Sequence, residues 1–107
     1  MNRPKIVAIT GSTKFKDDFR KVTAQETLAG NVVLTVHVFR HDQEWAHLTE
    51  EQCANLDKLF QTFIDMCDEL IVINTGGYIG DGTRRDIEKA TELKKPVQYA
   101  FSKQHVQ

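Results

Sequence analysis

The feature that most constrains this chain is an alternation of short apolar runs with segments of helical periodicity. The runs occupy residues 5–10, 32–38, 69–74 and 96–101, and the first three are rich in β-branched residues. Near-continuous apolar runs of this length are typical of parallel strands that are covered on both faces. Because helical patterns separate them, the predicted order is strand, helix, strand, helix, strand, helix, strand.

Three segments carry apolar side chains three or four residues apart, the spacing of an amphipathic helix. Gly30 is placed to end the first helix, and Lys94 and Lys95 lie at the carboxyl end of the third, where the helix dipole favours positive charge. The alternation predicts a single α/β domain over residues 1–107, with a small doubly wound, flavodoxin- or Rossmann-like parallel sheet of about four strands and helices on both faces. The apolar helix residues are Phe15, Phe19 and Val22, then Leu56, Leu59, Phe60, Phe63 and Cys67, and finally Ile87, Ala90 and Leu93.

Composition and charge narrow the range of partners. The 107 residues carry a net charge of −1, from 14 basic and 15 acidic side chains that are mixed along the chain. Because no basic stripe is visible, duplex nucleic acid is excluded as the expected partner. No apolar run reaches membrane-spanning length, so neither a membrane segment nor a leader is expected. A core of this size favours a homodimer or larger assembly.

The cysteines and histidines show no metal-site spacing. Cys53 and Cys67 are interpreted as buried free thiols, which favours a reducing, cytoplasmic location. His37 and His41 are four residues apart, but they fall on a strand and its exit loop, without a matching carboxylate or cysteine. We therefore predict no metal and no organic cofactor.

The expected binding site follows from the fold class. In an open parallel sheet, ligands bind beyond the carboxyl ends of the strands. This geometry gathers residues 11–13, residues 37–41, the glycine-rich segment 74–86 and the tail after Phe101. The long polar connection 39–49 is expected to fold over the same site.

The turn after the first predicted strand is the first candidate binding segment. Glycine permits a sharp turn at Gly11, and the first amides of the next helix are then free to meet an anion. The hydroxyls of Ser12 and Thr13 are candidate ligands for phosphate or sugar, and capping of the helix by one of them is the alternative. The spacing is neither that of a P-loop nor that of a dinucleotide fingerprint.

The segment 74–86 contains four glycines directly after a buried strand. Glycine costs conformational entropy, so its concentration indicates close approach to a ligand or positive φ angles. Tyr78 is interpreted either as a stacking partner for a base or as a packing residue. Arg84 and Arg85 are explained either by a phosphate or an acidic neighbour, or by solvation at the surface with Arg84 paired to Glu88 one helical turn away. The candidate substrate-binding residues here are Gly77, Tyr78, Gly80, Gly82, Thr83 and Arg84, to which His41 is added.

Asp86 is the candidate catalytic residue, and it has two interpretations. If Thr83 is the N-cap of the third helix, Asp86 falls at N3 and closes a capping box. Alternatively, Asp86 is a reactive carboxylate beside the ligand. If the reaction of this carboxylate also needs a second acid, Asp42, Asp65 and the histidines are candidates.

Three segments carry a family resemblance: IVAITGST at residues 6–13, IDMCDELIVIN at 64–74 and GGYIGDGTRRDIEKATELKKPV at 76–97. The last contains a glycine-threonine pair, two variable residues, an acidic residue, then an alanine and a lysine-proline before the final strand. With these features the chain resembles the nucleoside 2-deoxyribosyltransferase-like superfamily, which includes deoxynucleotide N-hydrolases, and especially its small bacterial and phage members. The resemblance implies that Asp86 attacks or stabilises the anomeric carbon. It also implies that Gly11 and Ser12 contact sugar or phosphate, and that Gly80, Gly82 and Thr83 hold the 5′ end.

The function implied by this resemblance is hydrolysis or transfer of the N-glycosidic bond of a 2′-deoxynucleoside or its 5′-monophosphate. The small-molecule partner is thus a nucleoside or nucleotide. Asp86 is one methylene shorter than the glutamate usual at this position, and small displacements of reacting groups cost rate. A second hypothesis is therefore a nucleotide-binding or sensor module without chemistry. A third, a structural oligomer without a ligand, explains the sheet but not the glycine-rich segment.

Overall fold

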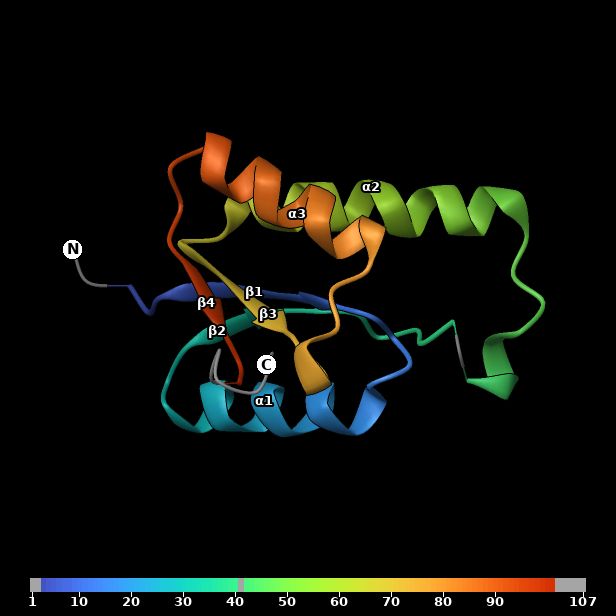
Figure 1. Cartoon of the computed structure of the whole chain (residues 1–107), viewed down its shortest axis with the longest axis horizontal. Coiled ribbons are helices and arrows are strands. Elements are labelled where there is room, and N and C mark those ends of the chain that lie inside the picture. The colour runs from blue at the N-terminus through green and yellow to red at the C-terminus, as the bar shows by residue number, and fades with distance from the viewer. Residues whose placement is uncertain (1–2, 41, 102–107) are drawn as a thin grey trace.

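The computed structural model describes residues 3–40 and 42–101 of the chain. Within them, four strands form one parallel sheet in the order β2-β1-β3-β4 (Figure 1). The predicted small, doubly wound α/β fold is confirmed. The strands are β1 (Ile6–Gly11), β2 (Val32–Leu34), β3 (Glu69–Ile73) and β4 (Val97–Tyr99).

The helices cover both faces of the sheet. Helix α1 lies on one face, and α2 and α3 lie together on the other (Figure 1). This division follows from right-handed crossovers, because the chain moves from β1 to β2 in one direction and then back across to β3 and β4. The strand order is flavodoxin-like and reverses between β1 and β3. The helices are α1 (Lys16–Leu28), α2 (Glu50–Met66) and α3 (Asp81–Glu92), with short 3-10 helices η1 (Gln43–Trp45) and η2 (Thr75–Gly77).

Each face of the sheet has its own apolar core. Successive side chains of a strand point to opposite faces, so β1 sends Val7 and Ile9 toward α1 and Ala8 toward α2 and α3. The core on the α1 face comprises Val7, Ile9, Phe19, Val22, Ile71 and Ile73. The core on the other face comprises Ala8, Ile64, Cys67, Leu70, Val72 and Ala90.

Helices α1 and α3 end in the same way. In α1, Gly30 lies just past the C-cap with φ 90°, and its N–H donates to the Thr27 carbonyl at 3.0 Å. The predicted role of Gly30 is thus confirmed. In α3, Lys94 occupies the equivalent position with φ 60°, and its N–H donates to the Thr91 carbonyl at 3.0 Å. Both ends are Schellman motifs, which glycine usually serves because it has no Cβ.

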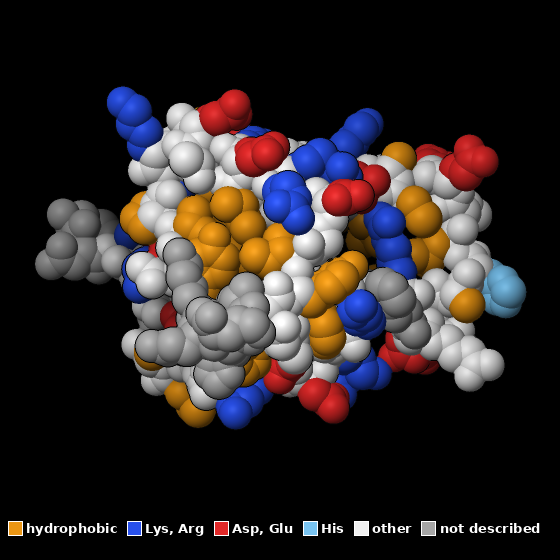
Figure 2. Space-filling view, in the orientation of Figure 1, with side chains coloured by type: hydrophobic (Ala, Val, Ile, Leu, Met, Phe, Trp, Pro, Cys, Tyr) orange, Lys and Arg blue, Asp and Glu red, His pale blue; other side chains and the backbone are white. Residues whose placement is uncertain are grey.

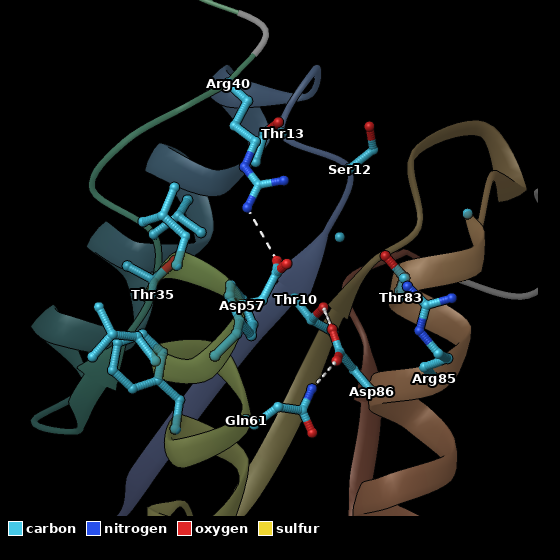
Figure 3. A pocket seen from close by; sticks show the side chains of 18 of the residues that line it. Thr10, Ser12, Thr13, Thr35, Arg40, Asp57, Gln61, Thr83, Arg85 and Asp86 are labelled. Atoms are coloured by element: carbon cyan, nitrogen blue, oxygen red, sulfur yellow. Dashed lines mark hydrogen bonds and ion pairs between the residues drawn. The ribbon is translucent and has the colours of Figure 1, made fainter. Parts of the chain in front are cut away.

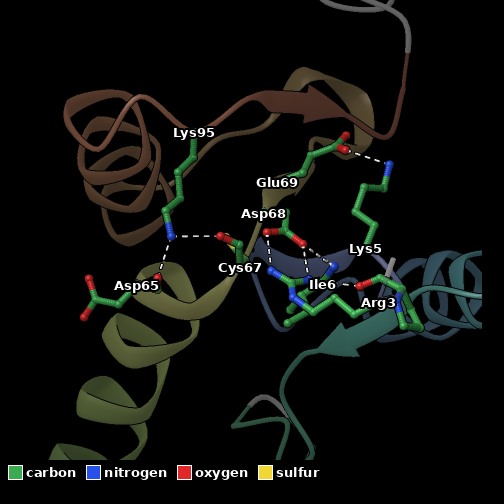
Figure 4. Close-up of polar contacts among 9 residues, drawn as sticks. Arg3, Lys5, Ile6, Asp65, Cys67, Asp68, Glu69 and Lys95 are labelled. Carbon is green, nitrogen blue, oxygen red and sulfur yellow. Dashed lines mark hydrogen bonds and ion pairs between the residues drawn. The ribbon is translucent and has the colours of Figure 1, made fainter. Parts of the chain in front are cut away.

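Charged contacts close the amino-terminal end of the sheet (Figure 4). Arg3 donates to both oxygens of Asp68, at 2.7 and 2.9 Å, and the Ile6 N–H donates to the same carboxylate at 2.8 Å. The Arg3 guanidinium and this amide hold the pKa of Asp68 well below its usual range.

The Lys95 ammonium donates to the carbonyls of Asp65 at 2.5 Å and Cys67 at 2.8 Å, and also to that of Ile64 at 2.8 Å. Lys95, which comes shortly after α3 in the sequence, therefore caps the carboxyl end of α2.

Strands β2 and β4 are shorter in the structure than the sequence pattern predicted. β2 ends at Leu34 rather than at residue 38, and β4 covers residues 97–99 rather than 96–101. β2 pairs with β1 only from Ile6 to Ala8, so the chain after Leu34 leaves the sheet despite its β-branched residues. Cys67 follows α2 instead of belonging to it and is buried at 3% exposure, whereas Cys53 is half-buried; both are free thiols.

The surface carries charges of both signs. On the face in Figure 2, Lys and Arg side chains are interspersed with Asp and Glu around a central group of apolar side chains. The helices in the described part of the chain are each too short or too polar to cross a bilayer.

Candidate functional site

A cleft of about 810 Å³ lies beyond the carboxyl ends of β1 and β3, where the strand order reverses. Open α/β sheets bind their ligands at this position. The predicted convergence of segments is thus seen for the turn after β1, the chain after β2 and the loop after β3 (Figure 3). A fourth wall, which the sequence argument did not include, comes from α2.

Gly11 forms the floor of the cleft for a steric reason. A Cβ at this position would lie 2.7 Å from the Ile73 Cβ and 2.9 Å from the Ile73 carbonyl oxygen, and the φ angle is 153°. Only glycine fits where β1 and β3 approach so closely. The need for glycine at this position is therefore explained by strand packing.

The hydroxyl-bearing turn after Gly11 does not cap α1. The N-cap of α1 is Phe15, which receives no side-chain capping bond, so the alternative that Ser12 or Thr13 caps this helix is wrong. The Ser12 Oγ instead accepts from the Lys14 N–H at 3.4 Å within the turn. Ser12 and Thr13 both line the cleft.

Asp86 lies half-buried in the cleft, between β1 and α2 (Figure 3). Its Oδ2 accepts from the Thr10 hydroxyl at 2.6 Å, and its Oδ1 accepts from the Gln61 amide at 3.3 Å. Burial raises the pKa of Asp86, against the hydrogen bonds from Thr10 and Gln61 and the positive charge of Arg85 and Lys89. A carboxylate that is desolvated and oriented in a cleft is typical of a reactive group.

The capping interpretation of Asp86 is wrong. Helix α3 begins at Asp81 with Gly80 as its N-cap, so Thr83 lies in the first turn and Asp86 in the second. The sequence pattern placed the helix start too late because glycine is a poor helix former, and Gly82 reads as part of a loop. The Asp86 carboxylate thus does not cap α3, and it lies in the cleft.

Helix α2 supplies an apolar wall with a polar edge. Leu56, Phe60 and Phe63 follow the i, i+4, i+7 spacing and line the cleft, with the rings of Phe60 and Phe63 5.7 Å apart. Asp57 and Gln61, also one turn apart, form the polar edge of this wall. The packing of α2 beside α3 therefore decides what Asp86 contacts.

Arg40 joins the chain after β2 to α2 across the cleft (Figure 3). Its guanidinium donates to the Asp57 Oδ1 at 3.0 Å and to the Cys53 carbonyl at 3.1 Å. Among the described residues of the connection predicted to fold over the site, Arg40 borders the cleft, and Trp45 and His47 do not.

Tyr78 both lines the cleft and packs on its neighbours. The Lys14 ammonium lies 3.9 Å from the centre of the Tyr78 ring, and the Phe15 ring meets it edge-on at 5.9 Å. The side chain remains 46% exposed. The structure thus supports the packing interpretation and leaves the ring accessible to a ligand.

Most of the predicted site residues surround the cleft, and a few do not. Gly77 has φ 82° and bonds through its N–H to the Asn74 carbonyl at 2.8 Å, so a backbone turn explains it. Arg84 is exposed and donates to the Ile79 carbonyl at 3.5 Å rather than to Glu88. His41 and the tail after Phe101 lie outside the described residues. The predicted residues that line the cleft are Gly11, Ser12, Thr13, Tyr78, Gly80, Gly82, Thr83 and Asp86.

The sequence argument chose the wrong one of two neighbouring arginines and missed several other cleft residues. Arg85 lines the cleft and Arg84 does not, because helical periodicity places adjacent side chains in different directions. Asp42 forms an ion pair with Lys16, and Asp65 one with Lys89, and neither acid lines the cleft. The helical stripe of α2 was visible in the sequence, but it was interpreted as core. The remaining lining residues that were missed include Thr10, Thr35, Arg40, Asp57, Phe60 and Gln61.

Within residues 3–40 and 42–101, no three His, Cys, Asp or Glu side chains are grouped to hold a metal ion. Comparison with protein-family models, curated proteins and solved structures yields no match to this chain.

Proposed function

We propose that the cleft binds a 2′-deoxynucleoside or its 5′-monophosphate and that Asp86 acts on the N-glycosidic bond, as in the superfamily that the sequence resembles. The observation that carries this proposal is the half-buried Asp86 carboxylate, held by Thr10 and Gln61 in an 810 Å³ cleft. Asp86 does not cap helix α3, and burial of its carboxylate is unfavourable for the stability of the folded protein. A costly buried carboxylate that faces a cleft is best explained by chemistry on a ligand.

The Asp86 end of the cleft suits a sugar and an anionic 5′ group. The N-cap of α3 is Gly80, and no side chain accepts a capping hydrogen bond there. The first backbone N–H groups of the helix can therefore donate to a ligand. Arg85 adds positive charge beside Gly82, with its Nη2 3.8 Å from where a Gly82 Cβ would lie. Ser12 also lines the cleft. These groups favour the monophosphate over the free nucleoside.

The proposed reaction takes place at C1′ of the sugar. An oxygen of Asp86 attacks C1′ or stabilises its positive charge while the bond to the base nitrogen breaks. The departing base takes a proton from an acid in the cleft; of the acids named from the sequence, His37 lines the cleft, whereas Asp42 and Asp65 do not. Water then attacks C1′ in hydrolysis, or the nitrogen of a second base attacks it in transfer. The attacking group gives its proton to the acid that had protonated the departing base, and the Asp86 carboxylate is regenerated.

The test is chromatographic detection of free base after incubation with each of the four deoxynucleosides and their 5′-monophosphates. Asp86→Asn should abolish base release and retain ligand binding, because the amide keeps the shape but not the charge. Asp65→Asn is the matched control, since this aspartate is exposed and lies outside the cleft. Equal release by wild type and Asp86→Asn would refute the proposal.

A nucleotide-binding module without chemistry is the alternative outcome of the same experiment. It is supported if the wild type is stabilised by the same ligands in thermal unfolding but releases no base at high protein concentration. Absence of both binding and release would refute both functions.

A further inference from the structure

The two ends of the cleft differ in chemistry. The end that contains Asp86 is polar, with the hydroxyls of Thr10 and Ser12 and the start of α3. The apolar side chains of the cleft come mainly from Leu56, Phe60 and Phe63 of α2 and from the chain after β2, and the Arg40–Asp57 ion pair lies between these two segments (Figure 3). A ligand that fills the whole cleft must therefore join a polar group to a planar or apolar one.

Thr35 stands out at the apolar end. It is only 7% exposed, it borders the cleft, and its Oγ1 has no hydrogen-bond partner within the described part of the chain. No other buried side-chain oxygen or nitrogen of the described residues is left in this state. Buried polar groups in native proteins are almost always paired, so an unpaired one requires an explanation.

The surroundings of Thr35 indicate what kind of group could supply its missing hydrogen bond. Directly after Leu34 the chain leaves the sheet, so the residues that follow have no strand partner to hold them. Thr35, Val36 and His37 also border a second cavity of about 340 Å³ on the α1 side. Val36 packs against the core on the α1 face, and Thr35 itself is buried between the cleft and this second cavity.

We propose that the apolar end of the cleft holds the nucleobase and that Thr35 is the residue that reads its polar edge. This inference rests on the proposed function, which places the sugar beside Asp86 and so directs the base toward α2. The Phe60 and Phe63 rings provide aromatic surface on which a base packs. A hydroxyl both donates and accepts, so Thr35 satisfies its hydrogen bond by pairing with a ring nitrogen or an exocyclic group.

A buried polar group is a strong source of selectivity. A site that hydrogen-bonds its ligand rejects an analogue that lacks the matching group, because the protein group is then left unpaired. In the free protein the same group carries the cost of being unpaired. Thr35 therefore lowers the stability of the free protein and raises the selectivity of the complex.

The test measures binding by calorimetry, with the four deoxynucleoside 5′-monophosphates and with 2-deoxyribose 5-phosphate, which has no base. Thr35→Val replaces the hydroxyl by a methyl at nearly constant volume. It should weaken binding of the preferred monophosphate about tenfold and leave binding of 2-deoxyribose 5-phosphate unchanged. Thr35→Ser keeps the hydroxyl and should retain the wild-type order of preference. Thr35→Val should also unfold at a temperature no lower than that of the wild type.

The outcomes separate this inference from the proposed reaction. If the wild type binds and ranks the monophosphates but releases no base, the reaction is refuted and the role of Thr35 stands. If Thr35→Val keeps the ranking, or weakens 2-deoxyribose 5-phosphate equally, the role of Thr35 is refuted and the reaction is unaffected. If neither the monophosphates nor the four deoxynucleosides bind to the wild type, both are refuted.

Discussion

Replacement of Gly11 by alanine tests the close approach of strands at the floor of the cleft. The added Cβ would lie 2.7 Å from the Ile73 Cβ and 2.9 Å from the Ile73 carbonyl oxygen, whereas carbon atoms pack best at about 3.5–4.0 Å. The two residues are the last register pair of β1 and β3, the two inner strands of the sheet, so relief of the clash requires these strands to separate at that end. Overpacking of this kind typically costs about 1–3 kcal/mol.

The backbone conformation adds to this cost. At φ 153°, Gly11 occupies a region that side-chain-bearing residues rarely adopt, and such strain is worth about 1–3 kcal/mol. The sum, about 2–6 kcal/mol, is a large part of the 5–15 kcal/mol typical of a domain. We expect the melting temperature of Gly11→Ala to fall by at least about 10 °C, since 1 kcal/mol corresponds to about 4–8 °C at this size.

Urea unfolding followed by circular dichroism measures the effect, with Gly82→Ala as the matched control. At Gly82 the added Cβ meets only the Arg85 Nη2, at an ordinary 3.8 Å, and the residue lies in α3. Because alanine favours helix more than glycine does, this control should gain up to about 1 kcal/mol. If Gly11→Ala loses less than about 1 kcal/mol, the steric account of Gly11 is refuted.

Three further predictions concern charge and helix ends. Burial raises the pKa of Asp86, so the folded state holds this proton more tightly than the unfolded state, and stability falls as the pH rises from the usual aspartate range through the raised pKa. Asp86→Asn should remove this fall and be the more stable protein at neutral pH in urea unfolding across the pH range; an unchanged pH dependence would contradict the assignment. Lys94→Gly should stabilise the protein by about 1 kcal/mol, because glycine adopts φ 60° without cost, and Lys94→Ala, which keeps the Cβ, should show no such gain. Lys95→Met should lower the free energy of unfolding by about 1–3 kcal/mol, because three carbonyls of the α2 terminus lose a charged donor, whereas the exposed Lys58→Met should change it little.

The site was only partly predictable from local sequence. The segment 74–86 and the turn at Gly11 were found because glycine and hydroxyl residues after a strand are a local signal. Asp57 and Gln61 were missed because their importance comes from the docking of α2 beside α3. The start of α3 was misplaced because the glycines at its first turn resemble a loop, and that error produced the capping interpretation of Asp86.

The sequence by itself determined the order of elements, the parallel sheet and the helices on both faces. These follow from hydrophobic periodicity and turn residues, which act over a few positions along the chain. Only the tertiary structure decided that Asp86 meets Thr10, 76 residues away, and Gln61, 25 residues away. The tertiary structure also decided that the Thr35 hydroxyl is buried without a hydrogen-bond partner in the described part of the chain. Contacts of this kind depend on how helices dock across the sheet, and no local pattern records that geometry.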